Sequence, residues 1–317
     1  MKKLLLIGTK PPPLGGVTVF VERLYNHLEI RNDINFKFID YKRVNTKTLI
    51  KEIFNSNVVH LNGSNPFFRL FVVSISKILF KKVLNTIHGD LGRFNTTQNL
   101  ADYIAMFLST MPLVLNDKSL VKALKINKKS IKISSFIPPL SDMKDDKIEE
   151  IMDDYGFDDF IFCTNASKVS FDRLGNEIYG ITYLIKIFKT LPAKYKLIIS
   201  TPSEEYLKYL EANKIEIPEN IKIVSFNHNF VNVIKKSDVM IRATSTDGDA
   251  ISIKEALYFG KEVFCTNVVS RPERVKLFGY GDQVKLKKMI LSYEKKEKQK
   301  FQVENSLQEL IKLYKTI

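Results

Sequence analysis

The sequence lacks any apolar run long enough to cross a membrane. None of its apolar stretches approaches the about 20 residues that a transmembrane helix needs. The first segment, MKKLLLIGTK, starts like a signal peptide, but its apolar run from Leu4 to Ile7 is too short for one. We therefore expect a cytoplasmic protein that is either soluble or peripherally attached to the inner face of the plasma membrane.

Cysteine and histidine are scarce, with two and four residues in 317. Cys163 and Cys265 both lie in apolar, strand-like runs, FIFCTN and EVFCTN, which favours buried free thiols over a disulfide or a metal site. No spacing of histidines and cysteines is typical of metal ligands. We therefore expect neither a metal ion nor a tightly bound cofactor.

Acidic residues are few in the first half of the chain. Residues 1–139 hold 21 Lys and Arg against 8 Asp and Glu, whereas residues 140–317 hold 28 against 27. A half this basic implies an acidic partner, which is a nucleic acid, an anionic lipid surface or a phosphorylated ligand. The alternative is solvated surface lysine in a lysine-rich proteome, which does not predict the asymmetry. Nucleic acid is not expected, because no helix-turn-helix, zinc pattern or interleaved aromatic and basic strand is present.

Size and composition indicate a globular protein of two domains. The 317 residues exceed the size at which one hydrophobic core stops growing, and 44% hydrophobic with 26% charged residues is ordinary globular composition.

The first half alternates short apolar runs with amphipathic ones. This rhythm predicts parallel strands covered by helices on both faces. The expected strands are 3–8, 34–40, 57–63, 82–90, 111–116 and 131–139, and the expected helices are 17–29, 46–55 and 64–80. The helix over 64–80 opens with Ser64, Asn65 and Pro66, which is a typical helix start.

An acidic stretch, 138–159, interrupts this rhythm and predicts a linker followed by a surface helix. The alternation then resumes, and a charged tail over 285–317 has a helical pattern. The expected strands are 160–167, 196–201, 221–226, 238–244 and 262–267, and the expected helices are 179–192, 203–213 and 228–237. The sequence thus predicts two doubly wound α/β domains that face a cleft, with ligands at the carboxyl ends of the strands.

Two candidate sites follow strands in the first half. Gly15 and Gly16 in TKPPPLGGV allow positive φ and a close backbone approach before a helix, although a turn without a ligand is the alternative. The segment is neither a Walker loop nor a G-x-G-x-x-G fingerprint. His60 and His88 each end a predicted strand, and His88 is the stronger candidate because Gly89 and Asp90 follow it. A structural histidine with satisfied hydrogen bonds is the alternative for each.

Two more candidates lie in the second half. Lys168 and Arg173, in NASKVSFDRLGNEIYG, have the charge to hold phosphates, or else are solvated loop cations. Arg242 lies in the apolar run DVMIRAT and, if buried, needs either an acidic partner or an anionic ligand. Arg271 follows in SRPERV.

The segment TSTDGDAISIKEALYFGKEVFCTN concentrates acids before a predicted helix. Ser252 and Glu255 have the S-x-x-E spacing of a capping box, in which both side chains bond backbone N–H groups at a helix start. A capping box does not explain Asp247 and Asp249 just upstream, which suggest contacts to a polar ligand such as sugar hydroxyls. An internal ion pair of Arg242 with one of these acids is the alternative.

These motifs resemble the family-4-type retaining glycosyltransferases of the GT-B fold, which assemble bacterial surface glycans. The resemblance is carried by PPPLGGVTVFVERL, by HGD at a strand end, by YGITYLIKIF and most strongly by DVMIRATSTDGDAISIKEALYFGKEVFCTN. Asp247 and Glu255 keep the spacing of the family's E-x7-E motif, with Asp in place of the first Glu. The rhythm is similar over almost the whole chain, but the likeness is specific only over 238–272.

The resemblance implies domains at 1–145 and 146–295, with a helix in 296–317 that crosses back to the first. It implies catalytic roles for His88, Asp247 and Arg242, and contacts to the donor nucleotide sugar from Gly15, Gly16, Lys168, Arg173, Asp249, Ser252, Glu255 and Arg271. One departure is Tyr179, which stands where the family has the Lys of a Lys-Gly pair. Lys168, Arg173 and Arg242 are all candidates to replace that charge.

The implied reaction transfers a hexose from a nucleotide diphosphate sugar to a hydroxyl of a glycan, with retention at the anomeric carbon. A lipid-linked acceptor would suit the basic first domain, and residues 65–82 are a candidate membrane-facing helix or else an ordinary sheet-covering helix. A nucleotide-sugar epimerase on the same scaffold and a non-catalytic binding protein are the alternatives.

Overall fold

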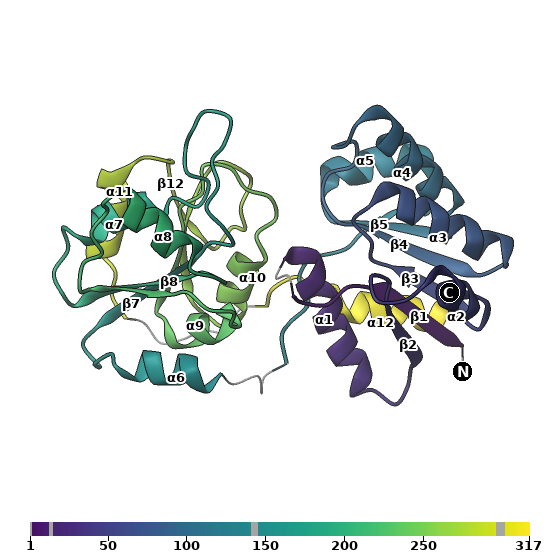
Figure 1. The fold of residues 1–317 in the computed structure, drawn as a ribbon, viewed down its shortest axis with the longest axis horizontal. Helices are drawn as coiled ribbons and strands as arrows, with labels where there is room; N and C mark the ends of the chain where they lie inside the picture. The colour runs from purple at the N-terminus through teal and green to yellow at the C-terminus, as the bar shows by residue number, and fades with distance from the viewer. Residues whose placement is uncertain (1, 13–14, 141–144, 296–301) are drawn as a thin grey trace. The chain divides into compact units, whose positions relative to one another are not determined.

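The computed structural model describes residues 2–12, 15–140, 145–295 and 302–317. The chain divides into two compact units (Figure 1): unit 1 is Met1–Leu140 with Glu304–Ile317, and unit 2 is Ser141–Val303. Parts of the predicted linker (141–144) and of the predicted tail (296–301) lie outside the described residues.

Unit 1 is built on a parallel sheet of six strands in the order β2-β1-β3-β4-β5-β6. The strands are β1 (Lys3–Gly8), β2 (Asn35–Asp40), β3 (Val58–Leu61), β4 (Lys82–Ile87), β5 (Met111–Val114) and β6 (Ile131–Lys132). Its central strands β1, β3 and β4 are buried almost throughout, as expected when helices cover both faces.

Helices cover both faces of this sheet. They are α1 (Gly16–Glu29), α2 (Thr46–Phe54), α3 (Pro66–Ile78), α4 (Thr96–Leu108), α5 (Asp117–Ile126) and, from the far end of the chain, α12 (Leu307–Thr316). Helices α1 and α12 pack in one apolar core, and α2, α3 and α4 pack in a second. A third, smaller core lies between β4, β5, α4 and α5.

Unit 2 repeats the design with the order β12-β11-β10-β7-β8-β9, all parallel. The strands are β7 (Phe160–Asn165), β8 (Tyr195–Ser200), β9 (Ile221–Val224), β10 (Val239–Arg242), β11 (Glu262–Thr266) and β12 (Lys276–Phe278). One face is covered by α7 (Ile181–Phe188), α8 (Glu205–Ala212) and α11 (Gln283–Leu291), and the other by α6 (Asp146–Asp153), α9 (Phe230–Lys236) and α10 (Ile251–Tyr258).

The predicted α/β class and doubly wound parallel sheets are confirmed. The start of α3 follows its local signals, since Asn65 accepts hydrogen bonds from the N–H groups of Phe67 and Phe68 while Pro66 occupies the first turn. The strand predicted over 131–139 is shorter, covering only β6, and α4, α5 and β12 had no counterpart among the predicted elements.

Each sheet has one point where the chain order reverses. In unit 1 this point lies between β1 and β3, whose following helices α1 and α3 cover opposite faces. In unit 2 it lies between β7 and β10, followed by α7 and α10 on opposite faces. In open α/β sheets, ligands bind beyond the carboxyl ends of the strands at such a reversal point.

Two further predictions concern single features. Cys163 and Cys265 are free and buried, as predicted. Among the described residues, no helix combines the length and apolar character that crossing a bilayer requires.

Candidate functional site

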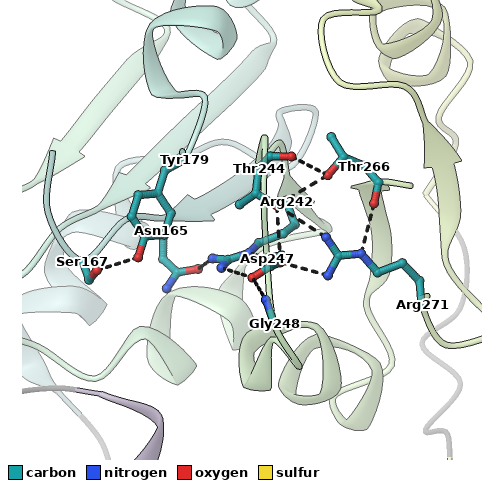
Figure 2. A network of polar contacts seen from close by, with 9 residues as sticks. All are labelled: Asn165, Ser167, Tyr179, Arg242, Thr244, Asp247, Gly248, Thr266 and Arg271. Atoms are coloured by element: carbon teal, nitrogen blue, oxygen red, sulfur yellow. Dashed lines mark hydrogen bonds and ion pairs between the residues drawn. The ribbon is translucent and has the colours of Figure 1, made fainter. Parts of the chain in front are cut away.

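A buried carboxylate with two arginines lies at the carboxyl end of β10 (Figure 2). Arg242, the last residue of β10, donates from Nε and Nη2 to the two oxygens of Asp247 at 3.1 and 2.9 Å. Arg271 donates from Nη1 to Asp247 Oδ2 at 2.9 Å. The Thr244 hydroxyl and the Gly248 N–H complete the shell at 3.3 and 3.0 Å. The internal ion pair of Arg242 with Asp247 is therefore present.

The three charged groups carry a net charge of +1 in a nearly buried place. The side chain of Asp247 is 7% exposed and those of Arg242 and Arg271 are 10% and 2% exposed. Burial opposes ionisation of Asp247, but the hydrogen bonds and charges of the two arginines outweigh it and hold the carboxyl pKa below its usual value. One positive charge is thus left uncompensated within this triad.

The triad lies at the reversal point of the unit 2 sheet. Arg242 Nη1 donates to Asn165 Oδ1 at 3.3 Å, which joins the ends of the neighbouring strands β10 and β7. The Arg242 guanidinium carbon also lies 5.3 Å from the centre of the Tyr179 ring. The Tyr179 hydroxyl in turn bonds Ser167 at 2.6 Å. Arg242 therefore lies between Asn165 and the Tyr179 ring.

The predicted capping box is wrong. Helix α10 begins at Ile251 with Ala250 as N-cap, and no side chain caps it. Ser252 and Glu255 are buried inside the helix, so they do not stand at the N-cap and N3 positions. The helix begins two positions earlier than a cap at Ser252 requires, since Ala250 is its N-cap. Just upstream, Asp247 pairs with the arginines and Asp249 pairs with Lys254 at 2.5 Å.

Lys168 and Arg173 lie on the loop between β7 and α7 and are both exposed. Their exposure contrasts with the burial of the triad. The same loop contains a residue that the sequence analysis missed, Glu177, whose buried carboxylate accepts the N–H groups of Ile181 and Thr182 at 3.0 Å each. Glu177 thus caps α7. The polar loop offered no familiar spacing signal for it, since Glu177 lies four positions before the first N–H group that it accepts.

Gly15 and Gly16 form the start of α1, and neither uses the positive φ that glycine allows. Gly15 is the N-cap with φ −170°, which any residue adopts, and Gly16 is the first helical residue. No side chain caps α1, and its first turn contains no acidic residue. Close packing against α1 does require glycine at Gly8, where an added Cβ would lie 2.8 and 2.9 Å from the Val21 methyl groups.

His88 follows β4 and is buried, with Nε2 at 3.0 Å from Asn62 Oδ1 beyond the neighbouring strand β3. Burial, with help from the charges of Arg69 and Arg93, lowers the His88 pKa to about 3, so the ring is neutral at physiological pH. His60 is structural instead: its ring nitrogens bond Tyr314 of α12 at 2.6 Å and Thr86 at 2.8 Å.

Within the described ranges, no group of three or more His, Cys, Asp or Glu side chains is arranged to hold a metal ion. Asp247 and Asp249 are instead paired with cations. The arrangement is therefore suited to binding an anion beside buried arginines.

Comparison with known families gives a match in unit 2. Residues 168–281 match the model of "Glycosyl transferases group 1", a segment of 114 of the 317 residues that contains the whole triad. No curated protein sequence is significantly similar to the chain.

Comparison with solved structures extends over both units. Anabaena HepE in complex with UDP is similar with a TM-score of 0.69 and 14% identity, covering 100% of both chains. A glycosyltransferase from Rickettsia africae is similar with a TM-score of 0.67 and 14% identity over 99% of this chain and 98% of that one. A UDP-GlcNAc 2-epimerase from Neisseria meningitidis, bound to UDP-GlcNAc, is similar with a TM-score of 0.62 and 14% identity over 100% of both chains.

The structural likeness is at low identity and establishes the fold alone, which is GT-B with two Rossmann-like units. The family match lies in unit 2 and indicates glycosyl transfer. Together with the two parallel sheets, it supports a glycosyltransferase of GT-B fold whose group 1 domain lies in residues 168–281.

Proposed function

We propose that the protein is a retaining hexosyltransferase of the family-4 type. It moves a hexose from a nucleotide diphosphate sugar to a hydroxyl of a glycan acceptor during bacterial polysaccharide assembly, for example of an O-antigen or a capsule. The observation that carries the proposal is the Arg242–Asp247–Arg271 triad at the reversal point of the unit 2 sheet, inside the segment that matches glycosyl transferases.

The triad suits the leaving group of such a reaction. Negative charge grows on the nucleotide diphosphate as the glycosidic bond breaks, and preorganised cations stabilise that charge. Arg242 is the better placed of the two arginines, since its guanidinium faces the Tyr179 ring and Asn165. We therefore assign to Arg242 the charge that the family places on the Lys of its Lys-Gly pair.

Asp247 positions the two arginines in this proposal. Its oxygens are held by both guanidinium groups, a hydroxyl and an N–H group, so a nucleophilic role would require breaking these bonds. Front-face attack fits this arrangement better than double displacement, with an oxygen of the leaving phosphate taking the acceptor proton. Because the arginines supply the positive charge, we expect turnover to continue in EDTA.

The remaining candidates receive roles from the family resemblance. Glu255 contacts the ribose hydroxyls, while Asp249 and Ser252 lie near it at the start of α10. Lys168 and Arg173 on the exposed loop approach the phosphates. In unit 1, the uncapped start of α1 at Gly15 and Gly16 offers N–H groups to the diphosphate, and neutral His88 contacts the donor sugar.

The acceptor in this proposal is linked to a lipid, and the enzyme works peripherally on the inner face of the plasma membrane. Support comes from the charge of residues 1–139, with 21 basic against 8 acidic side chains.

An epimerase is the second candidate, because the Neisseria UDP-GlcNAc 2-epimerase shares the fold with a TM-score of 0.62. The family match favours transfer. The two activities differ in product: a transferase releases a nucleoside diphosphate for each sugar moved, whereas an epimerase returns an isomeric nucleotide sugar. A non-catalytic binding protein would do neither.

The test is a calorimetric and thermal-shift screen with UDP, GDP, ADP and CDP and their sugars. With the nucleotide that binds, we compare Arg242→Met, Glu255→Gln and a distant control, Lys285→Gln, against the nucleoside, monophosphate and diphosphate. Arg242→Met should weaken binding of the nucleoside diphosphate about 10- to 100-fold, because charge-assisted hydrogen bonds are lost. Binding of the nucleoside should hardly change. Glu255→Gln should weaken all three.

The control Lys285→Gln should bind like the wild type, because Lys285 lies exposed on α11. If the diphosphate affinity is unchanged in Arg242→Met, the triad is not part of the donor site. Failure of every nucleotide to bind would exclude the transferase.

A further inference from the structure

Unit 1 exposes large apolar side chains along three neighbouring helices. Helix α3 presents Phe67, Phe71 and Ile78 at spacings of four and seven, and α4 presents Leu100, Ile104 and Phe107 at spacings of four and three. Such spacings place each set on one side of its helix. Helix α5 adds Val121 and Leu124, and the turn after α3 adds Phe80, which is 95% exposed. We call these nine residues the apolar face.

The apolar face forms one surface, because the three helices that carry it pack side by side. Helices α3, α4 and α5 lie next to one another along the same side of the unit 1 sheet (Figure 1). Arg69 of α3 and Asp102 of α4 form a buried ion pair that joins the first two helices. The buried residues of α4, Ala101, Asp102, Ala105 and Met106, form its inner side, so the exposed set points away from the sheet.

This arrangement corrects the predicted membrane-facing helix over 65–82. Arg69 is not available to a surface, since it is 1% exposed and bound to Asp102 and to the Gly63 carbonyl. The exposed apolar residues also extend beyond that segment onto α4 and α5. A single amphipathic helix is therefore replaced by a face made of three.

Lysines accompany the apolar face. Residues 66–129 contain ten Lys and Arg and only three acids, one of which is the buried Asp102. Six exposed or half-exposed lysines in this range form no ion pair within the described residues: Lys77, Lys81, Lys82, Lys125, Lys128 and Lys129. Large exposed apolar patches rimmed by charge mark interaction sites, and this charge is positive.

We infer that this face docks on the surface of an anionic lipid bilayer. Apolar rings inserted at the headgroup boundary combined with lysines above it are the features of peripheral membrane binding. A second copy of the chain is a poorer occupant, because it would bring the same lysines against these ones. The inference rests on the proposed function only in that a lipid-linked acceptor would lie at the same surface.

The test is co-sedimentation of the full chain with vesicles of phosphatidylcholine alone or with 30% phosphatidylglycerol. We expect binding to the anionic vesicles that falls with added salt. The double variant Lys77→Glu/Lys82→Glu should bind the anionic vesicles at least about 25-fold more weakly, because each lysine near such a surface contributes about fivefold to the affinity. Phe67→Ser/Phe107→Ser, at side chains 51% and 69% exposed, should also release the protein.

Matched control variants lie in unit 2: Phe157→Ser, at a side chain 92% exposed, and Lys285→Glu/Lys288→Glu on α11. Both should bind vesicles like the wild type. Nucleotide binding, measured without lipid, should be unchanged in all variants, which separates this inference from the transferase proposal.

Three outcomes would overturn the inference. The first is the same vesicle binding in the face variants as in the controls. The second is a wild-type dimer that becomes a monomer in Phe67→Ser/Phe107→Ser, which would assign the face to a second copy. The third is retention on duplex DNA without retention on vesicles.

Discussion

At the scale of single residues, the site depends on one short acid. Asp247 balances only one of two arginines and holds both within hydrogen-bond distance. Its place in the E-x7-E spacing was visible in the sequence, and so was the alternative of an ion pair with Arg242. The contact of Arg242 with the Tyr179 ring could not be predicted, since 63 positions separate them and only the pairing of β7 with β10 brings them together.

Replacing Asp247 by Asn should be strongly destabilising. It leaves two buried guanidinium groups without their counter-charge, and breaking a buried ion pair costs about 3–5 kcal/mol. Asp249→Asn is the matched control and should cost below about 1 kcal/mol, because the Asp249–Lys254 pair is partly exposed. Urea unfolding of both variants measures the difference, and equal midpoints would contradict the structural role given to Asp247.

At the scale of elements, α7 depends on the glycine at its N-cap. Gly180 has φ +62° and an added Cβ would lie 2.3 Å from the Ala243 carbonyl oxygen, on the residue after Arg242. The start of α7 therefore approaches the end of β10 more closely than any other residue type permits.

Gly180→Ala should lower the free energy of unfolding by about 2 kcal/mol or more, from the left-handed backbone and the displaced carbonyl. The same change at Gly248, where no atom lies within 4 Å of the added Cβ, should be close to neutral. Thermal unfolding of the pair checks this. Nucleotide affinity should fall only in Gly180→Ala, because a shift of Ala243 moves Arg242; equal affinity in both variants would argue against this coupling.

Elements were predictable where their apolar residues face the core. Helix α3 carries both an Asn-Pro start and buried valines at its centre. Helix α4 reverses the usual pattern, since small or charged residues such as Ala101 and Asp102 face inward while Leu100, Ile104 and Phe107 face outward. Hydrophobic periodicity alone cannot assign such a helix. The S-x-x-E spacing misled for a different reason, since α10 already begins at Ile251 and so contains Ser252.

At the scale of the whole molecule, buried histidines should make stability depend on pH. Burial lowers the pKa values of His60 and His88 from 6.5 to about 3. The unfolded chain therefore binds more protons below pH 6.5, and stability falls as the pH decreases from 6.5 toward 3. Each histidine contributes a slope of up to about 1.4 kcal/mol per pH unit.

The measurement is the free energy of unfolding in urea between pH 7.5 and 5, above the range in which most carboxylates titrate. The slope below pH 6.5 should be shallower in His60→Gln/His88→Gln than in the wild type. An unchanged slope would show that these rings do not remain neutral in the folded protein.

In the sequence, the whole of unit 2 is inserted between the two segments that form unit 1. The core around β1 and α1 includes Leu307, Leu310, Ile311 and Tyr314 of α12. During synthesis, which adds about 5–20 residues per second, these side chains emerge only after unit 2 has been made. The nascent sheet of unit 1 must therefore wait about 10 seconds or more with the part of its face that α12 covers still exposed, so the unit that begins first is completed last. A chain cut short within unit 2 would lack α12, and its unit 1 would expose this apolar surface to chaperones and proteases.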